Sequence, residues 1–427
     1  MKRKNINIRK DLLYVSMCCM VTYSLSAQEN ITVNKGGLYI KPNTVIATYF
    51  DFSNKGTGNV INDGEFYFYG DYNNEGLFSF TTNQRTGYVV FEGSNKTIQS
   101  ISGDSPSMFY DVLFNKAGTT YSFDLTNDIS SQGKVNLLNG VVLMNKEQGG
   151  AFIFLKGATH INTSDKSHVD GEVSKQGNDN FRYPIGDGGY YRYAQISAPA
   201  AEADHYTGEY FLKNSNPLYP HTNKAPGIEM IDTQEYWAVE QKENTQGSVL
   251  LTLSWDERTT PAALLANDAT DLRIVRWDAS QNLWVDEGGI INRADKTVTT
   301  PAVVNGFGIF TLAKLTPDMD TPTEIVIYNG VRPNGDGAND YFIIDNIQRY
   351  PNNSVRIYNR WGREIFKTTN YDSNGNVFRG YSENSANFKD GEKLPTGTYY
   401  YILEYEYTDA ETPRMIKKSG FLHLEND

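Results

Sequence analysis

The chain has 427 residues and a formal net charge of −12, with 29 Tyr, 21 Phe and 37 Gly but only 2 Cys and 5 His. This acidic balance disfavours nucleic-acid binding, because phosphate contacts require clustered Lys and Arg. Aromatic residues and glycine favour pleated sheets joined by tight turns, and no segment has a long amphipathic helical period. The composition therefore predicts an all-β protein.

Residues 1–27 have the three-part pattern of a secretory signal peptide. Five Lys and Arg residues precede a short apolar run from Leu12 to Val21, and cleavage is expected between Ala27 and Gln28. The apolar run is shorter than the roughly 20 residues that a membrane-spanning helix requires. Both cysteines lie inside this segment, so the mature chain is expected to have neither a disulfide nor a Cys-based metal site.

Residues 28–175 carry a pattern punctuated by glycine. Gly58, Gly64, Gly70 and Gly76 recur every six residues, with short alternating runs such as EFYFY between them. Alternation directs every second side chain inward, and the glycines are expected to allow turns at positive φ. Strands this short cannot bury a face alone, so the pattern predicts the stacked coils of a β-solenoid. Because the period drifts, meandering antiparallel hairpins are the alternative.

Residues 176–315 lose this rhythm. Their candidate strands are longer and richer in Trp, as in EYWAVEQ (235–241), SVLLTLSW (248–255) and LRIVRW (272–277). Turn residues separate these strands, which is typical of an antiparallel β-sandwich. The polar segment 316–324 contains two prolines, which break strand pairing and predict a linker.

Residues 325–427 contain at least six alternating runs, a density that fits an immunoglobulin-like β-sandwich. The longest run follows the period of two that places alternate side chains on opposite faces of a strand. One face of this strand is predicted to carry Tyr399, Tyr401, Leu403, Tyr405 and Tyr407.

Three motifs follow one another in this segment: PNGDGAND (333–340), NRWG (359–362) and PTGTYYY (395–401). Their order and spacing resemble the gliding-motility-associated C-terminal domain, which is the type B sorting domain of the type IX secretion system. The resemblance covers almost all of residues 325–427. The residues that match the family's motifs are Pro333, Asn334, Gly335, Asp336, Gly337, Asn339, Asp340, Asn359, Arg360, Trp361, Gly362, Pro395, Gly397, Tyr399, Tyr401 and Gly420.

This resemblance implies a route and a set of partners. Such domains are exported by the general pathway, recognised in the periplasm by the type IX machinery and carried across the outer membrane to the cell surface. They are attached to large surface proteins, adhesins and some enzymes, often with an outer-membrane β-barrel partner. The chain departs from the family at one turn, where Phe378-Arg379-Gly380 stands in place of the usual Trp-Asp-Gly. No role for that acidic residue carries over.

The first motif also suggests a metal site. Asn334, Asp336, Asn339 and Asp340 bring together the oxygen ligands that Ca²⁺ prefers. The EF-hand spacing fails, however, because Ala338 stands where the third ligand belongs and no Glu closes the loop. The simpler interpretation is a tight Gly/Asx turn, in which side-chain oxygens accept hydrogen bonds from local backbone amides. We therefore expect no cofactor, with calcium as the alternative.

The second motif predicts a hairpin in which Gly362 adopts positive φ and Trp361 packs on the sheet. The sharper alternative is a receptor contact, with Arg360 beside Trp361 forming a surface cation–π pair or recognition patch.

Motifs for catalysis are absent from the sequence: it has no GxSxG, HExxH or P-loop. His160 and His168 are eight residues apart, but a zinc site needs a further ligand and none is suggested. Tyr190, Tyr191 and Tyr193 are candidates for stacking on sugar rings.

Together these features predict an exported cell-surface protein with a structural or adhesin-like role and no catalytic activity. The solenoid and the central sandwich (residues 28–315) together form the passenger, which would contact glycans or other surface proteins. The alternative is a secreted carbohydrate-binding module, or a polysaccharide-degrading enzyme, with the same C-terminal domain.

Overall fold

The computed structural model describes residues 30–93, 97–116, 121–144, 149–243, 245, 247–266, 272–315, 325–373, 375–383, 389–408 and 413–426. The expected signal peptide (1–27), its cleavage site between Ala27 and Gln28, and the expected linker (316–324) lie outside these residues. Strands make up 50% and helices 2% of the structure, which confirms the all-β prediction. No helix in the described part is long and apolar enough to cross a membrane.

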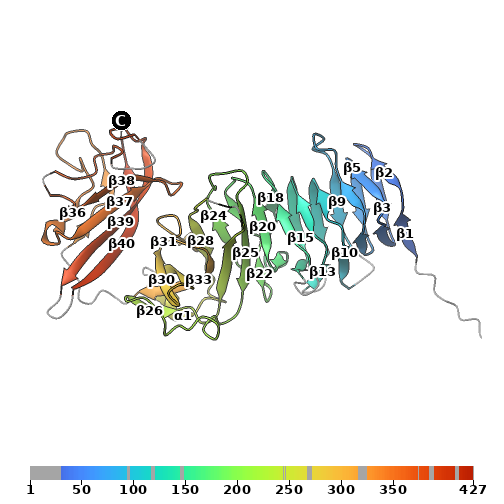
Figure 1. Ribbon diagram of the computed structural model, residues 1–427, viewed down its shortest axis with the longest axis horizontal. Helices are drawn as coiled ribbons and strands as arrows, with labels where there is room; N and C mark the ends of the chain where they lie inside the picture. The colour runs from blue at the N-terminus through green and yellow to red at the C-terminus, as the bar shows by residue number, and fades with distance from the viewer. Residues whose placement is uncertain are drawn as a thin grey trace, which may run out of the picture.

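The molecule is elongated, with a β-solenoid of about six turns at its N-terminal end and a separate C-terminal unit at the other (Figure 1). Three parallel sheets form the walls of the solenoid. The first contains β1 (Ile31–Asn34), β4 (Asp51–Asn54), β7 (Tyr72–Asn74), β10 (Gln99–Ser102), β13 (Tyr121–Leu125), β16 (Val141–Met144) and β19 (Val169–Asp170). The second begins with β2 (Gly37–Ile40), β5 (Asn59–Asn62), β8 (Leu77–Ser79), β11 (Ser107–Phe109), β14 (Ile129–Ser131), β17 (Phe152–Phe154) and β20 (Val173–Gln176). The third contains β3 (Val45–Thr48), β6 (Glu65–Phe68), β9 (Tyr88–Phe91), β12 (Asp111–Asn115), β15 (Lys134–Asn139) and β18 (Thr159–Ile161).

The solenoid prediction is therefore confirmed, and the antiparallel-hairpin alternative is wrong, because neighbouring strands within each wall are parallel. In the first wall, Ile31 pairs with Asp51 and Phe52 pairs with Tyr72, so these early coils are 20 residues long. The six-residue glycine spacing is one side of a coil. Each of the four glycines lies at a corner between two consecutive strands from β4 to β8.

The expected reason for these glycines is wrong. None of the four has positive φ. Instead, a Cβ at Gly64 would lie 2.5 Å from the carbonyl oxygens of Lys41 and Thr44, and a Cβ at Gly76 would lie 2.3 Å from that of Gly58. At Gly64, Gly70 and Gly76 the backbone of the preceding coil thus approaches too closely for any side chain, whereas at Gly58 the atom nearest to a Cβ would be Oδ1 of Asn54 in the same coil.

Aromatic rings and an asparagine ladder fill the solenoid interior. Phe91 stacks between Phe68 and Phe114, with ring centroids 5.5 Å apart on each side. At the inner corner, the Asn34 amide donates to Asn54 and the Asn54 amide donates to Asn74, each at 2.8 Å. The ladder pairs amides that would be costly to bury unsatisfied.

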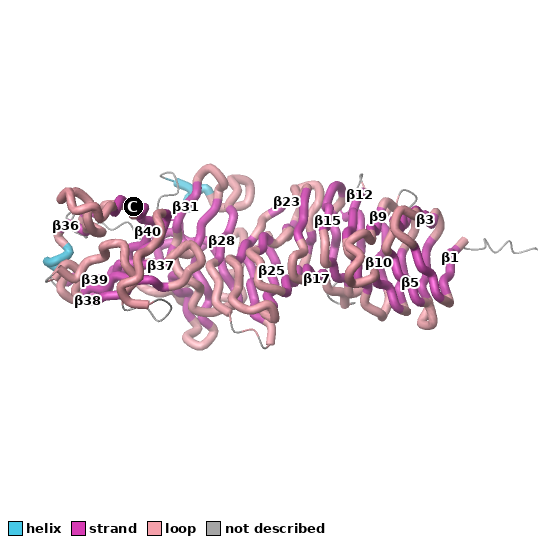
Figure 2. Tube along the Cα trace, turned by 90° about the horizontal axis from the view of Figure 1, so that it is seen from above, coloured by secondary structure: helices cyan, strands magenta, loops and turns pink. Residues whose placement is uncertain are grey.

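The second wall of the solenoid continues into the central region. There β20 pairs in parallel with β17 and antiparallel with β25. The strands that follow continue the row of strands along the long axis of the molecule (Figure 2). The added strands are β25 (His205–Phe211), β27 (Tyr236–Gln241), β33 (Gly308–Leu315), β29 (Leu272–Asp278) and β30 (Leu283–Gly288), with β26 (Ile228–Ile231) on β33. The same region contains a second, antiparallel sheet, built from β21 (Phe181–Arg182), β24 (Ala194–Ile196), β28 (Leu251–Ser254), β32 (Thr297–Thr299) and β31 (Ile290–Asn292).

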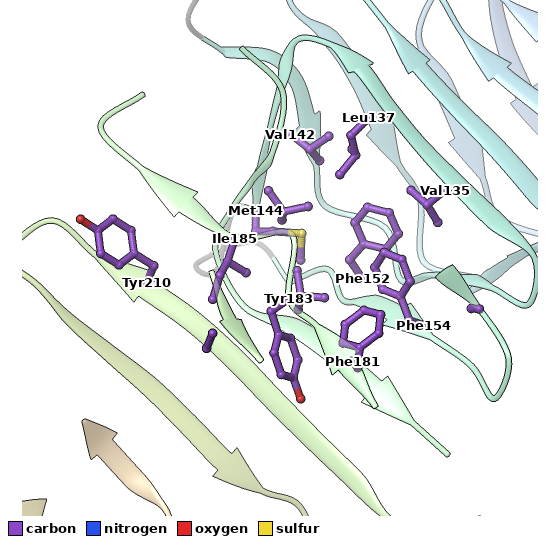
Figure 3. Packing of buried hydrophobic residues seen from close by; sticks show 14 of the residues in the cluster. Val135, Leu137, Val142, Met144, Phe152, Phe154, Phe181, Tyr183, Ile185 and Tyr210 are labelled. Carbon is purple, nitrogen blue, oxygen red and sulfur yellow. The ribbon is translucent and has the colours of Figure 1, made fainter. Parts of the chain in front are cut away.

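One hydrophobic core runs through both regions, from Ile40 to Leu312. At the junction, Phe152 and Phe154 of the last coils meet Phe181 and Tyr183 of the central region (Figure 3). The core does not break at residue 175, so burial couples the solenoid to the sheets that follow it.

The C-terminal unit has its own core. Its five-stranded sheet follows the order β35 (Gly330–Val331), β40 (Pro413–Leu424), β39 (Gly397–Thr408), β37 (Asn353–Tyr358) and β38 (Glu364–Thr369), and β34 (Val326–Ile327) pairs with β36 (Ile344–Asp345). The prediction that five side chains share one face of β39 is confirmed: Tyr399, Tyr401, Leu403 and Tyr405 are buried in that core and Tyr407 is half-buried against it.

Candidate functional site

The first motif of the C-terminal unit is a loop whose carboxylates accept backbone hydrogen bonds. Asp340 accepts from the amides of Gly335 at 2.7 Å and Gly337 at 2.9 Å, while Asp336 accepts from the amide of Ala338 at 2.8 Å. The Ala338 bond is the main cause that lowers the pKa of Asp336. These are the local bonds that an Asx turn requires.

The remaining residues of this loop also have local roles. Asn334 donates to a carboxylate of the same loop at 2.7 Å. Asn339 adopts a left-handed φ of 57°, and its carbonyl accepts the amide of Arg332 at 2.7 Å. Pro333 lies 3.4 Å from the position of a Cβ at Gly380. Throughout the described residues, no group of three or more His, Cys, Asp or Glu side chains could hold a metal ion.

The second motif forms the tip of the β37–β38 hairpin. Asn359 Oδ1 accepts from the amides of Trp361 and Arg363, each at 3.0 Å, and Gly362 has the expected positive φ of 75°. Trp361 is 51% exposed, so the prediction that it packs on the sheet is wrong. The turn directs its indole to solvent, where the guanidinium of Arg360 lies 4.3 Å from the ring centroid.

The third motif starts β39. The Tyr399 hydroxyl donates to the carbonyl of Pro395 at 2.7 Å, which anchors the start of the strand. Gly397 has open space where a Cβ would stand, whereas a Cβ at Gly420 would lie 2.7 Å from the Tyr401 hydroxyl. Gly420 and Tyr401 are direct partners across β39 and β40, so the buried ring occupies the space above the glycine.

The turn Phe378-Arg379-Gly380 is held by local contacts. Phe378 is buried, and its amide donates to the Tyr371 hydroxyl at 3.1 Å. Gly380 adopts a φ of 79°. Arg379 stands where the family has an acid, and its guanidinium lies 5.4 Å from the Tyr341 ring centroid.

The C-terminal unit also contacts the central region. A Cβ at Gly362 would lie 2.8 Å from Val303 Cγ1 and 3.0 Å from Leu250 Cδ2, so the hairpin tip packs closely against that region. The strands β31, β32, β39 and β40 also line an open cleft of about 700 Å³ between the two regions. Its residues are Ile290, Ile291, Asn292, Arg293, Thr297, Thr299, Thr398, Tyr400 and Phe421.

Two aromatic side chains line one side of this cleft. Tyr400 and Phe421 are direct cross-strand partners, and Phe421 is 49% exposed. The threonines Thr297 and Thr299 line the cleft from the other unit. Ile290 and Ile291 lie on the same side, and the Thr299 hydroxyl is hydrogen-bonded to that of Thr252 at 2.8 Å. A cleft with apolar and polar groups on its walls can accept a ligand that is itself apolar on one face and polar at its edges. No local pattern in the sequence marks this site, because its two sides are more than 90 residues apart.

Arginine side chains lie over two of the three tyrosines that were expected to stack on sugars. Arg258 lies 4.9 Å from the ring centroid of Tyr190, and Arg182 lies 4.2 Å from that of Tyr193. Tyr191 is half-buried, and burial raises the pKa of its hydroxyl. At least one ring face of Tyr190 and Tyr193 is therefore occupied.

The two histidines considered for zinc have separate partners. His160 bonds Thr163 at 2.7 Å and the carbonyl of Arg182 at 2.6 Å, while His168 bonds the carbonyl of Ser164 at 3.0 Å. Burial lowers the pKa of both imidazoles.

A buried ion pair in the central region was not expected. Arg192 Nη2 lies 2.7 Å from Glu235 Oε1, and the two side chains are 1% and 0% exposed. The Tyr210 hydroxyl donates to the same carboxylate at 2.7 Å and the Thr260 hydroxyl at 2.5 Å. Because solvent does not reach this network, its role is to fix the packing of the two central sheets.

The comparisons with known proteins match the C-terminal unit alone. No curated protein and no solved structure matches the chain. Residues 325–424 match a family model described as the CHU_C Type IX secretion signal domain. This range contains all three turn motifs and the separate core, which confirms the resemblance found in the sequence. The C-terminal unit of this chain is therefore a CHU_C type IX secretion signal domain.

Proposed function

We propose that this protein is a structural or adhesin-like module of the cell surface, delivered by its C-terminal domain. One observation carries the proposal: the type IX secretion signal domain coincides with a folded unit that has its own core. That domain implies export, a surface location and an interaction with the type IX machinery. The passenger supports a presenting role, because stacked coils with a continuous core form a stiff support.

The proposed route has two steps. Residues 1–27 direct the chain into the periplasm and are removed between Ala27 and Gln28. The machinery then carries the folded protein across the outer membrane, where a β-barrel partner holds it at the surface. We divide the passenger into a solenoid (28–175) and a β-sandwich (176–315), joined by a linker (316–324) to an immunoglobulin-like sandwich.

Removal of the C-terminal domain tests delivery. In a host with a working type IX system, the full chain should be accessible to protease on intact cells, whereas a chain lacking residues 325–427 should stay in the periplasm. The matched control is the full chain in the same host without the type IX system, which should also retain it. A truncated chain that still reaches the surface would refute the proposal.

The interdomain cleft supports a second candidate function, glycan binding. A pyranose ring offers C–H groups to an aromatic surface and hydroxyl groups to polar side chains. The cleft has both, with Tyr400 and Phe421 as its aromatic residues and threonines, Asn292 and Arg293 as its polar ones. On a glycan array, the purified chain should bind a subset of sugars, and Phe421→Ala should weaken that binding about tenfold. Met415→Ala is the control, because Met415 is 61% exposed on the same strand and does not line the cleft.

Two outcomes separate the alternatives. Equal binding by the wild type and the Phe421→Ala variant would remove the cleft as a glycan site. Turnover of a bound polysaccharide in a parallel assay would favour the enzyme alternative over a binding role. For the 333–340 loop we propose no cofactor; a rise in thermal stability on adding Ca²⁺ would instead support the calcium alternative.

A further inference from the structure

The tip of the β37–β38 hairpin presents an aromatic residue that the core of its domain does not use. Trp361 is 51% exposed, whereas Phe342, Tyr371 and Phe378 in the same domain are all 0% exposed. Arg360 lies against the indole, 4.3 Å from the ring centroid. Exposure of so large an apolar surface is unfavourable in water, and the contact with Arg360 covers only part of it.

Hydrogen bonds hold the turn that carries this pair. The side chain of Asn359 accepts two amide hydrogen bonds within the turn, and Gly362 supplies the left-handed conformation that the turn requires. Gly362 also packs against Leu250 and Val303 of the central region, which fixes the tip relative to the passenger. A surface that is already ordered loses little conformational entropy when it binds.

The chemistry of the tip indicates the chemistry of its partner. Residues 359–363 contain two arginines and no acidic residue, in a chain of net charge −12. Trp and Arg are the residues that most often dominate the binding energy of protein interfaces. A complementary surface would combine an apolar slot for the indole with carboxylates for the guanidinium groups.

We propose that Arg360 and Trp361 form the contact by which the type IX machinery recognises this domain, through an acidic, aromatic-accepting groove on a machinery component. The inference rests on the proposed function, because it presumes that the domain is recognised for export. It assigns that recognition to one hairpin, while the buried motif residues maintain the fold that presents it.

The test uses the full chain in a host with a working type IX system. Trp361→Ala and Arg360→Glu should each lower the protease-accessible surface fraction about tenfold and leave the protein in the periplasm. Trp361→Phe should restore part of the export, because it keeps an aromatic ring beside Arg360. Met415→Ala, which removes an apolar side chain that is even more exposed (61%) from β40, should export like the wild type.

Thermal unfolding of each purified variant shows whether the domain still folds. Export of Trp361→Ala at the wild-type level would overturn the inference and leave the proposed function standing. Retention of Met415→Ala along with Trp361→Ala would also overturn it, because export would then depend on general surface integrity. If the wild-type chain itself is not exported, the proposed function fails instead.

Discussion

Gly420 lies opposite Tyr401 in the sheet of the secretion signal domain, and a Gly420→Ala substitution tests this packing. The new Cβ would lie 2.7 Å from Oη, 2.9 Å from Cζ and 3.0 Å from Cε1 of Tyr401. The ring has little room to move, because it is 6% exposed and its centroid lies 4.9 Å from that of Phe342. Overpacking costs about 1–3 kcal/mol, and alanine recovers about 0.4–1 kcal/mol by restricting the unfolded chain. We expect a net loss of about 1–2 kcal/mol.

Native-state amide exchange of peptides from β39 and β40 measures this loss, because it reports the free energy of local opening. Gly397→Ala is the matched control, since nothing lies within 4 Å of its Cβ position. We expect that variant to be neutral or stabilised by up to about 1 kcal/mol. In a Tyr401→Phe background, which lacks the nearest atom, the cost of Gly420→Ala should fall by at least about 0.5 kcal/mol.

Two results would refute the steric explanation. One is a Gly420→Ala variant as stable as Gly397→Ala. The other is an unchanged cost in the Tyr401→Phe background, which would show that the contact with the ring is not the cause.

Three further substitutions test the passenger. Gly76→Ala places a Cβ 2.3 Å from a main-chain oxygen of the preceding coil, and should cost about 2–3 kcal/mol in amide exchange of β5 and β8, whereas Gly37→Ala, with open space at its Cβ, should be neutral. Burial lowers the pKa of the His168 imidazole below its usual 6.5. At pH values below 6.5 the unfolded chain therefore binds a proton at His168 more readily than the folded chain does, and the free energy of unfolding should fall as the pH decreases from 7.5 to 5. In urea titrations at each pH, the His168→Gln variant should show a smaller decrease in the free energy of unfolding than the wild type. Arg192→Met leaves the buried carboxylate of Glu235 without its partner and should cost about 3–5 kcal/mol, part of which Glu235→Gln should recover in the double variant.

Each of these has a contradicting outcome. Equal amide exchange in the Gly76→Ala and Gly37→Ala variants would show that close approach of the preceding coil is not why Gly76 is required. A pH profile that His168→Gln leaves unaltered would place the titrating groups elsewhere. An Arg192→Met variant that unfolds like the wild type would mean that the ion pair is not needed for stability.

Local patterns in the sequence predicted local structure well. The alternation in β39 identified its buried face, and the position of Gly362 after NRW indicated positive φ. The glycine spacing indicated short stacked strands, but one side of a coil does not reveal how many sides close it. The corner glycines were misinterpreted for the same reason, because the clash at Gly64 or Gly76 comes from a different coil.

Features that depend on distant segments were not predictable. Tyr400 and Phe421 belong to the outward face of their strands, and only the placement of β31 and β32 makes that face one side of a cleft. Arg192 and Glu235 are 43 residues apart and nothing near either suggests a partner. Trp361 was predicted to pack on the sheet, whereas the hydrogen bonds that Asn359 accepts hold a turn that directs it outward.

The nearest-neighbour stacking of the coils makes length an adjustable property of this protein. Each coil contacts mainly the one before and the one after it, so duplication of a coil of some 20 residues lengthens the rod by about 4.8 Å without disturbing either end. The solenoid can therefore change in length while the C-terminal domain stays the same.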